Sequence, residues 1–134
     1  MTRGLKNNNP LNIRKSKDVF LGENPQSTDV AFKQFTSVAY GYRAAFVTLG
    51  TYLSRGLNTI EKIVKTWAPP NENSTESYIQ HVVTRSGVPR NKVLTNTSGK
   101  DYIAIVAAMS WSENGVPAVM ADVQAGFKLQ TKIK

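Results

Sequence analysis

The chain has 134 residues, which corresponds to one domain, and 40% of them are hydrophobic and 19% charged, as in an ordinary globular protein. It has no cysteine and one histidine, His81, which excludes disulfide scaffolds, thiolate metal sites and cysteine nucleophiles and leaves little for a zinc hydrolase or a serine–histidine triad. Seventeen Lys and Arg against nine Asp and Glu give a net charge of +8, so we expect a polyanionic partner.

The basic residues gather at the two ends of the chain. Five of them precede the first acid, Asp18, and three lysines follow Phe127 without a counter-charge. Such ends attract nucleic acid, an anionic lipid surface or a cell wall alike. The longest apolar run, Tyr102–Trp111, is shorter than the roughly 20 residues that span a bilayer, and the first ten residues lack the apolar region of a secretory signal. We expect a soluble domain that needs delivery to act outside the cytoplasm.

Residues 1–36 are rich in Asn, Pro, Gly and Ser and contain only short apolar pieces. Leu11–Arg14 and Ala31–Phe35 are typical of brief strands, and Gly22, Asn24 and Pro25 between them are turn-forming residues. This segment therefore predicts a small hairpin or irregular sheet.

Residues 37–134 show helical periodicity and predict the helical core of the same domain. A first helix begins at Ser37 and stops at Gly56. Asn58 is the expected cap of a second, Thr59–Trp67, which the prolines at 69–70 end. The polar run Asn71–Ser74 is expected to form a loop.

Three further helices complete the predicted core. One begins at Ser74 and stops near Gly87, and the last covers Val119–Phe127. Between them, Asp101–Ser112 is apolar nearly all round, which is typical of a helix buried at the centre of a fold.

Glu113 is the most informative acid because it follows that buried helix directly and precedes Asn114-Gly115. The negative end of a helix dipole and an apolar stripe of Tyr102, Val106 and Met109 both favour the protonated carboxyl. A carboxyl protonated near pH 7 is what general-acid cleavage of a glycoside requires. The alternative is a solvated residue at a helix end that a glycine stops.

Several strings in the chain resemble phage and prophage muralytic proteins, some of which are described as virion structural proteins. They are RGLKNNNPLNIR at residues 3–14, VAYGYRAAF, WAPPNENSTESYIQHV and SENG. The resemblance spans nearly the whole chain and is most specific at NNNP-x-NIR and WAPPNEN-x-T. It implies peptidoglycan as the partner, action on the bacterial cell wall after delivery, and an association with other phage particle proteins.

A more distant similarity is to lysozyme-like lytic transglycosylases, in which a buried helix ends at a catalytic Glu. Asn8–Arg14 and Phe32–Phe35 resemble their hairpin portion, and Tyr78-Ile79-x-x-Val82 resembles a tyrosine-bearing helix that lines their cleft. Here the helix that carries the Glu comes last. The similarity implies a mainly α (α+β) fold, a lysozyme-like domain with an N-terminal β-hairpin in circularly permuted order, with Glu113 as catalytic acid.

A second carboxylate would be needed only by a hydrolase. Asp29, at the start of the second expected strand, is the candidate to face Glu113 across a cleft, and Glu23 in the hairpin turn is the alternative. Each is otherwise a solvated turn acid. A transglycosylase needs neither, because its one carboxyl protonates the leaving oxygen and then takes the proton from the 6-hydroxyl of muramic acid.

Other polar residues are candidates to bind the glycan. Asn8, Asn9 and Asn12 offer amide groups suited to N-acetyl and hydroxyl groups, and Arg14 suits a lactyl or peptide carboxylate; the three asparagines are otherwise turn formers. Tyr78 is a candidate hydrogen-bond donor at the catalytic end of the cleft, or a core residue. Glu72 either binds substrate or caps the following helix.

The sequence thus predicts cleavage of peptidoglycan glycan strands, by a lytic transglycosylase or a muramidase, with no cofactor and no metal. Two rival functions remain open. One is a non-catalytic phage component of the same fold that only attaches to wall glycan. The other is a basic nucleic-acid-binding protein, disfavoured because the chain shows no nucleic-acid-binding motif.

Overall fold

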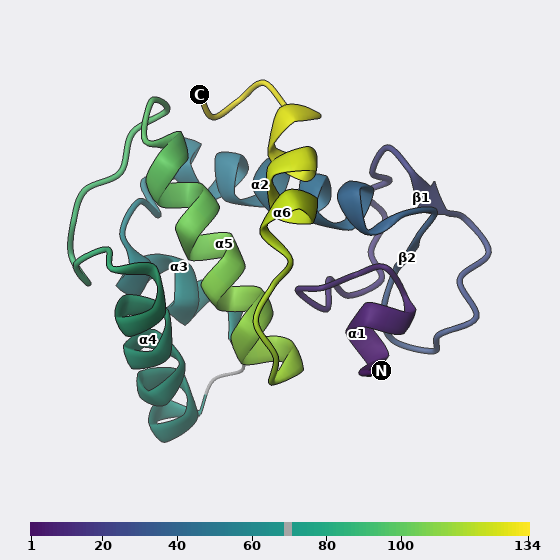
Figure 1. Cartoon of the computed structure of the whole chain (residues 1–134), viewed down its shortest axis with the longest axis horizontal. Helices are drawn as coiled ribbons and strands as arrows, with labels where there is room; N and C mark the ends of the chain where they lie inside the picture. The colour runs from purple at the N-terminus through teal and green to yellow at the C-terminus, as the bar shows by residue number, and fades with distance from the viewer. Residues whose placement is uncertain (69–70) are drawn as a thin grey trace.

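The computed structural model describes residues 1–68 and 71–134. These residues form a mainly helical domain with a small two-stranded sheet, which confirms the predicted mainly α class with a small β component (Figure 1). In chain order the elements are α1 (Arg3–Lys6), β1 (Glu23–Asn24), β2 (Gln34–Phe35), α2 (Val38–Ser54), α3 (Ile60–Trp67), α4 (Glu72–Ser86), α5 (Gly99–Asn114) and α6 (Met120–Lys128).

Helix α5 is the centre of the fold, as its apolar sequence predicts (Figure 1). Tyr102, Ile105, Val106 and Met109 on this helix are fully buried. Helices α2, α4 and α6 all contact α5, and α3 packs on α4. The apolar burial that stabilises the domain is therefore concentrated around the helix that carries Glu113 in its last turn.

Helices α2 and α6 cross closely because a glycine stands at the crossing. A Cβ atom on Gly126 would lie 2.8 Å from the carbonyl oxygen of Ala39 on α2. Beside this point, the rings of Phe46 and Phe127 pack edge to face with centroids 5.2 Å apart. This contact closes the core on the side of α5 that α4 does not cover.

Residues 1–36 contain a two-stranded hairpin and are called the hairpin lobe, but the predicted first strand is not one of its two strands. Strand β2 pairs antiparallel with β1, with Glu23 opposite Phe35 and Asn24 opposite Gln34. Leu11–Arg14 is not a strand and makes a single bridge, between Arg14 and Phe32. The physical reason is that Asn12 adopts a left-handed conformation with φ of 53°, which interrupts an extended backbone.

A buried cation stabilises the hairpin lobe. The Lys33 ammonium group, on a residue that is only 1% exposed, lies 3.0 Å and 3.1 Å from the two carboxylate oxygens of Glu23 and donates to the carbonyl of Asp18 at 2.7 Å. A buried ammonium requires such compensation for its lost hydration. Glu23 was the alternative candidate for a second catalytic carboxylate. Its carboxylate group instead forms an ion pair with Lys33.

Several predicted helix boundaries are wrong. Helix α5 covers Gly99–Asn114 instead of Asp101–Ser112, so Glu113 lies inside its last turn. Two further differences concern helix caps. Helix α4 begins at Glu72, inside the expected loop Asn71–Ser74, because the Asn71 side chain accepts a hydrogen bond from the Ser74 N–H at 3.1 Å. Helix α3 is capped by Thr59, not Asn58. The predicted stop at residues 69–70 lies outside the described residues.

The two chain ends lie at opposite ends of α5 (Figure 1). Thr2 contacts Asn114 in the last turn of this helix, whereas the Gly99 N–H at its start donates to the carbonyl of Lys134. The helix between the two contacts has 16 residues, so Gly99 and Asn114 lie about 22 Å apart along its axis at 1.5 Å per residue.

None of the helices in the described part of the chain has the length and apolar character that crossing a membrane requires.

Candidate active site

The carboxyl group of Glu113 is held by two donors from distant parts of the chain. The Asn12 amide nitrogen donates to one carboxylate oxygen at 2.9 Å, and the Tyr78 hydroxyl donates to the other at 3.0 Å. Three residues that the sequence analysis selected are thus brought together from the N-terminal segment, α4 and α5. Each carboxylate oxygen retains a second lone pair for a further partner.

The local backbone structure determines where the Asn12 amide and the Tyr78 hydroxyl lie. The left-handed turn at Asn12 is closed by its N–H, which donates to the Asn9 carbonyl at 3.0 Å. Tyr78 projects from α4, which packs along α5. Burial, and secondarily the nearby Glu113 carboxylate, raise the pKa of Tyr78 well above its ordinary value. The Tyr78 hydroxyl therefore stays protonated, and it remains a donor.

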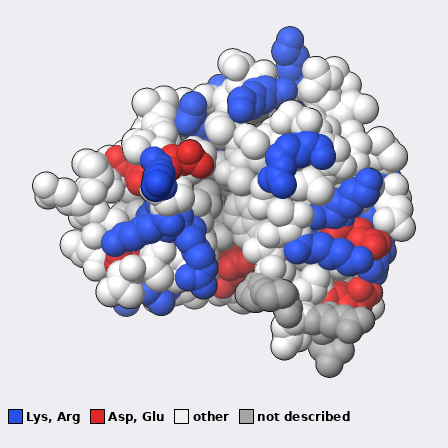
Figure 2. Space-filling view, turned by 180° about the vertical axis from the view of Figure 1, so that it is seen from behind, with Lys and Arg blue, Asp and Glu red and all other residues white. Residues whose placement is uncertain are grey.

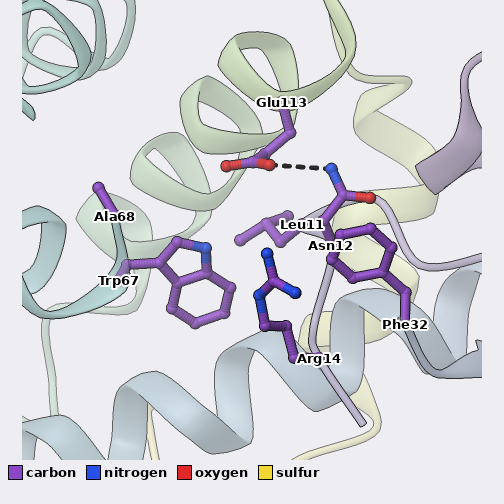
Figure 3. Close-up of a pocket in the computed structure, with 7 residues that line it drawn as sticks. All are labelled: Leu11, Asn12, Arg14, Phe32, Trp67, Ala68 and Glu113. Atoms are coloured by element: carbon purple, nitrogen blue, oxygen red, sulfur yellow. Dashed lines mark hydrogen bonds between the residues drawn. The ribbon is translucent and has the colours of Figure 1, made fainter. Parts of the chain in front are cut away.

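Glu113 faces a cavity of about 370 Å³ between the hairpin lobe and the helical body. Figure 3 shows its carboxyl group and the Arg14 guanidinium both pointing into this space, with the Trp67 and Phe32 rings at its sides. Leu11, Asn12 and Ala68 complete the lining. Seen from behind, the molecule is hollowed between its two lobes, with Lys and Arg side chains on both sides of the hollow (Figure 2).

Arg14 is the cationic wall of this cavity. Its guanidinium lies 5.0 Å from the centre of the Phe32 ring, and the Arg3 guanidinium lies 4.6 Å from the same ring. Arg3 is bound by Asp29, whereas Arg14 takes part in none of the ion pairs found in the described residues. Its planar N–H donors are therefore available to an anionic group of a ligand.

Trp67 and Phe32 also line the cavity, although neither was predicted from the sequence to be a site residue. Trp67 ends α3 and packs edge to face on Tyr52 with centroids 6.2 Å apart, so it has a packing role while it also lines the cavity. Phe32 lies in the segment before β2. The rare Trp-Ala-Pro-Pro string was the one available signal for Trp67, and only the fold brings it opposite Asn12.

Asp29 is not brought to Glu113. Its carboxylate accepts two hydrogen bonds from Arg3, both at 2.7 Å, and one from Asn7 at 3.0 Å. The N–H groups of Ala31 and Phe32 donate to it at 2.8 Å and 2.9 Å. It lines a separate depression on the outer side of the hairpin lobe. With its oxygens occupied in this way, Asp29 fixes the turn that leads into Phe32.

Replacing Asp29 with Asn should make the stability of the fold less sensitive to acid. Hydrogen bonds, first from Arg3 and then from the backbone of Ala31, hold the pKa of Asp29 far below its usual range. A lowered folded-state pKa contributes stability that is complete above the unfolded value of about 3.9 and is lost as the pH falls below it. The difference between the urea midpoints of the wild type and Asp29→Asn should be constant from pH 7 to about pH 5 and should narrow steadily below about pH 3.9. A difference that does not narrow in this acid range contradicts this role.

Two of the predicted sugar-binding asparagines are structural. The amide of Asn9 is fully buried, donates to the carbonyls of Ile13 and Lys33, and accepts from the Ile13 N–H, each at 2.9 Å. Asn8 donates to the Phe35 carbonyl at 3.1 Å. Neither lines the cavity. Both instead fold the turn that presents Asn12. The Glu72 side chain lies outside what the structure describes.

His81 is exposed on α4. Within residues 1–68 and 71–134, the side chains do not form a group of three or more His, Asp or Glu that could hold a metal ion.

No family model matches the sequence. Over 131 residues, however, the chain is 40% identical to Protein P5 of Pseudoalteromonas phage PM2. The alignment covers 94% of this chain and 80% of that phage protein, and it therefore includes nearly every residue of the cavity and of both lobes. The chain belongs to the family of Protein P5 of Pseudoalteromonas phage PM2.

Proposed function

We propose that this chain cleaves the glycan strands of peptidoglycan, with Glu113 as the acid. The observation that supports this function best is the Glu113 carboxyl group itself. It stands at the end of a buried helix, is oriented by Asn12 and Tyr78, and opens on a cavity with aromatic and cationic walls. Its cavity volume of about 370 Å³ lies in the range of small-ligand sites.

A single carboxyl group favours the lytic transglycosylase reaction over hydrolysis. Among the described residues that line the cavity, Glu113 is the one carboxylate, and Asp29 and Glu23 are bound by Arg3 and Lys33. In the proposed reaction Glu113 donates its proton to the leaving glycosidic oxygen as the bond to C1 breaks. The resulting carboxylate accepts the proton of the muramic acid 6-hydroxyl, whose oxygen bonds to C1 and closes an anhydro ring.

The walls of the cavity match the chemistry of this substrate. The Trp67 ring offers an apolar surface on which the C–H groups of a sugar can pack, and Phe32 supports the Arg14 guanidinium at the other side of the cavity. The free guanidinium of Arg14 suits the lactyl or peptide carboxylate of a muramoyl residue. A net charge of +8 favours association with an anionic wall.

The lysozyme-like architecture in circularly permuted order is part of the proposal. A helix that ends at the acid, a β lobe on the other side of the cavity and a tyrosine donor support the likeness. An association with phage particles is proposed from the phage relative.

Digestion of purified peptidoglycan, followed by mass spectrometry of the fragments, tests this function. We expect fragments that end in 1,6-anhydromuramic acid and carry no new reducing ends, because the substrate hydroxyl replaces water as nucleophile. Reducing muramic acid ends would instead indicate a muramidase with an activated water. Released peptides with intact glycan strands would overturn the glycosidase function.

A phage protein that binds the cell wall without activity is the second candidate, and the similarity to a phage protein is compatible with it. Co-sedimentation with purified wall, without release of any soluble fragment, would support this alternative. If the basic surface of the protein binds the cell wall and not nucleic acid, the purified protein should not retard DNA in a gel at physiological salt.

A further inference from the structure

The amide group of Asn114, the residue after Glu113, joins α5 to the N-terminal segment. Asn114 is 7% exposed, and its amide nitrogen donates to the Pro10 carbonyl at 2.8 Å and to the Ser110 carbonyl at 2.9 Å. Its carbonyl oxygen accepts the hydroxyl proton of Thr2 at 2.7 Å. A buried side chain of one helix thus binds both ends of the segment that leads to Asn12.

The Asn12 and Asn114 side chains converge on Gly4 of α1. A Cβ atom on Gly4 would lie 2.7 Å from the carbonyl oxygen of the Asn12 side chain and 3.0 Å from that of Asn114. The first distance is shorter than real Cβ atoms show and the second is tighter than nearly all of them, so a side chain at this position would displace the Asn12 amide. The side-chain amides of Asn12 and Asn114 therefore both pack against α1 at Gly4.

The side chain of Asn12 depends on this arrangement because it makes few other hydrogen bonds. Its amide nitrogen donates to Glu113, and its buried carbonyl oxygen has no hydrogen-bond partner among the described residues. Its backbone is in the left-handed region, two residues after the Pro10 carbonyl that Asn114 binds. Moving Pro10 would therefore move the donor of one of the two hydrogen bonds that orient the acid.

We propose that Asn114 is a positioning residue that, through Pro10 and Thr2, fixes the N-terminal segment on α5 and holds the Asn12 amide against the Glu113 carboxylate. The effect on catalysis rests on the proposed function. The geometric coupling does not, since it concerns contacts within the free protein.

The test uses Asn114→Ala and the isosteric Thr2→Val in the full chain. On soluble peptidoglycan fragments we expect Asn114→Ala to lower kcat about tenfold or more, the usual effect of losing a hydrogen bond to a charged group, with KM changed less than about twofold. Thr2→Val should lower kcat less, and Thr2→Ser, which keeps the hydroxyl, should restore it. In NMR spectra, the side-chain amide signals of Asn12 should shift in Asn114→Ala and Thr2→Val.

Thr59→Val is the matched control, because Thr59 is also a helix N-cap and its side chain accepts from the Lys62 N–H at 3.2 Å. It should lower the melting temperature while leaving kcat and the Asn12 signals unchanged. Wild-type kcat in folded Asn114→Ala, or an equal loss in Thr59→Val, overturns the proposal. If Asn114→Ala does not fold, Thr2→Val and Thr2→Ser decide it. If the wild type releases no fragments, the proposed function fails and the Asn12 signals alone decide the positioning role.

Discussion

Glu113→Gln should abolish lysis of purified cell wall while leaving the fold intact. The glutamine oxygen can still accept from Asn12, and its amide can donate to the Tyr78 oxygen, so both contacts of the native carboxyl have a substitute. What is lost is the transferable proton. Removing a general acid costs about 10²–10⁴ in rate, so turbidity clearing should fall to the level of buffer alone.

The matched control for this variant is Glu61→Gln, the same chemical change on the surface of α3, where Glu61 pairs with Lys65 and Arg90. Clearing by Glu61→Gln should equal that of the wild type. Circular dichroism of both variants checks the fold. Wild-type lysis by a folded Glu113→Gln protein would remove Glu113 from the mechanism and, with it, the proposed site.

Tyr78→Phe should lower kcat about 10- to 100-fold, because a hydrogen bond to a charged group contributes roughly 1.5–3 kcal/mol. The substitution removes only the hydroxyl that donates to Glu113 at 3.0 Å and keeps the ring between α4 and α5. The carboxyl group would then be oriented by Asn12 alone. Rates on soluble peptidoglycan fragments at saturating substrate measure this loss directly.

Tyr102→Phe is the control for the loss of a buried tyrosine hydroxyl. Tyr102 lies on α5, is fully buried, and its hydroxyl has no hydrogen-bond partner among the described residues. Removing that hydroxyl leaves no group unpaired, so kcat and stability should be unchanged or slightly improved. If Tyr78→Phe and Tyr102→Phe behave alike, the hydroxyl of Tyr78 has no role in orienting the acid.

Local signals in the sequence predicted the helical elements well. The run Asp101–Ser112 is apolar on all sides, and a helix of that kind has to be buried, so the position of α5 at the centre followed directly. The capping chemistry of Ser37 and the glycine stop at Gly87 likewise depend on neighbouring residues alone. Glu113 could be selected for the same reason, because its place relative to the helix end is a local property.

The contacts that side chains of the N-terminal segment make could not be predicted from local signals. Lys33 is a buried cation, and its partner Glu23 lies on strand β1. Asn8, Asn9 and Asn12 look alike in sequence, yet the first two fold the turn and the third contacts the acid. Asp29 was selected for facing Glu113, but its partner is Arg3. Each of these roles depends on which backbone comes alongside, and turn residues do not encode that.

By itself, then, the sequence determined a basic, mainly helical domain and placed one acid at the end of its central helix, because these follow from composition, periodicity and caps. Only the tertiary structure decided which side chains surround that acid. Asn12 is 101 residues from Glu113 and Tyr78 is 35 residues away, and Trp67 and Phe32 reach the cavity from two lobes. Such long-range contacts arise from packing of the whole core, which no local pattern specifies.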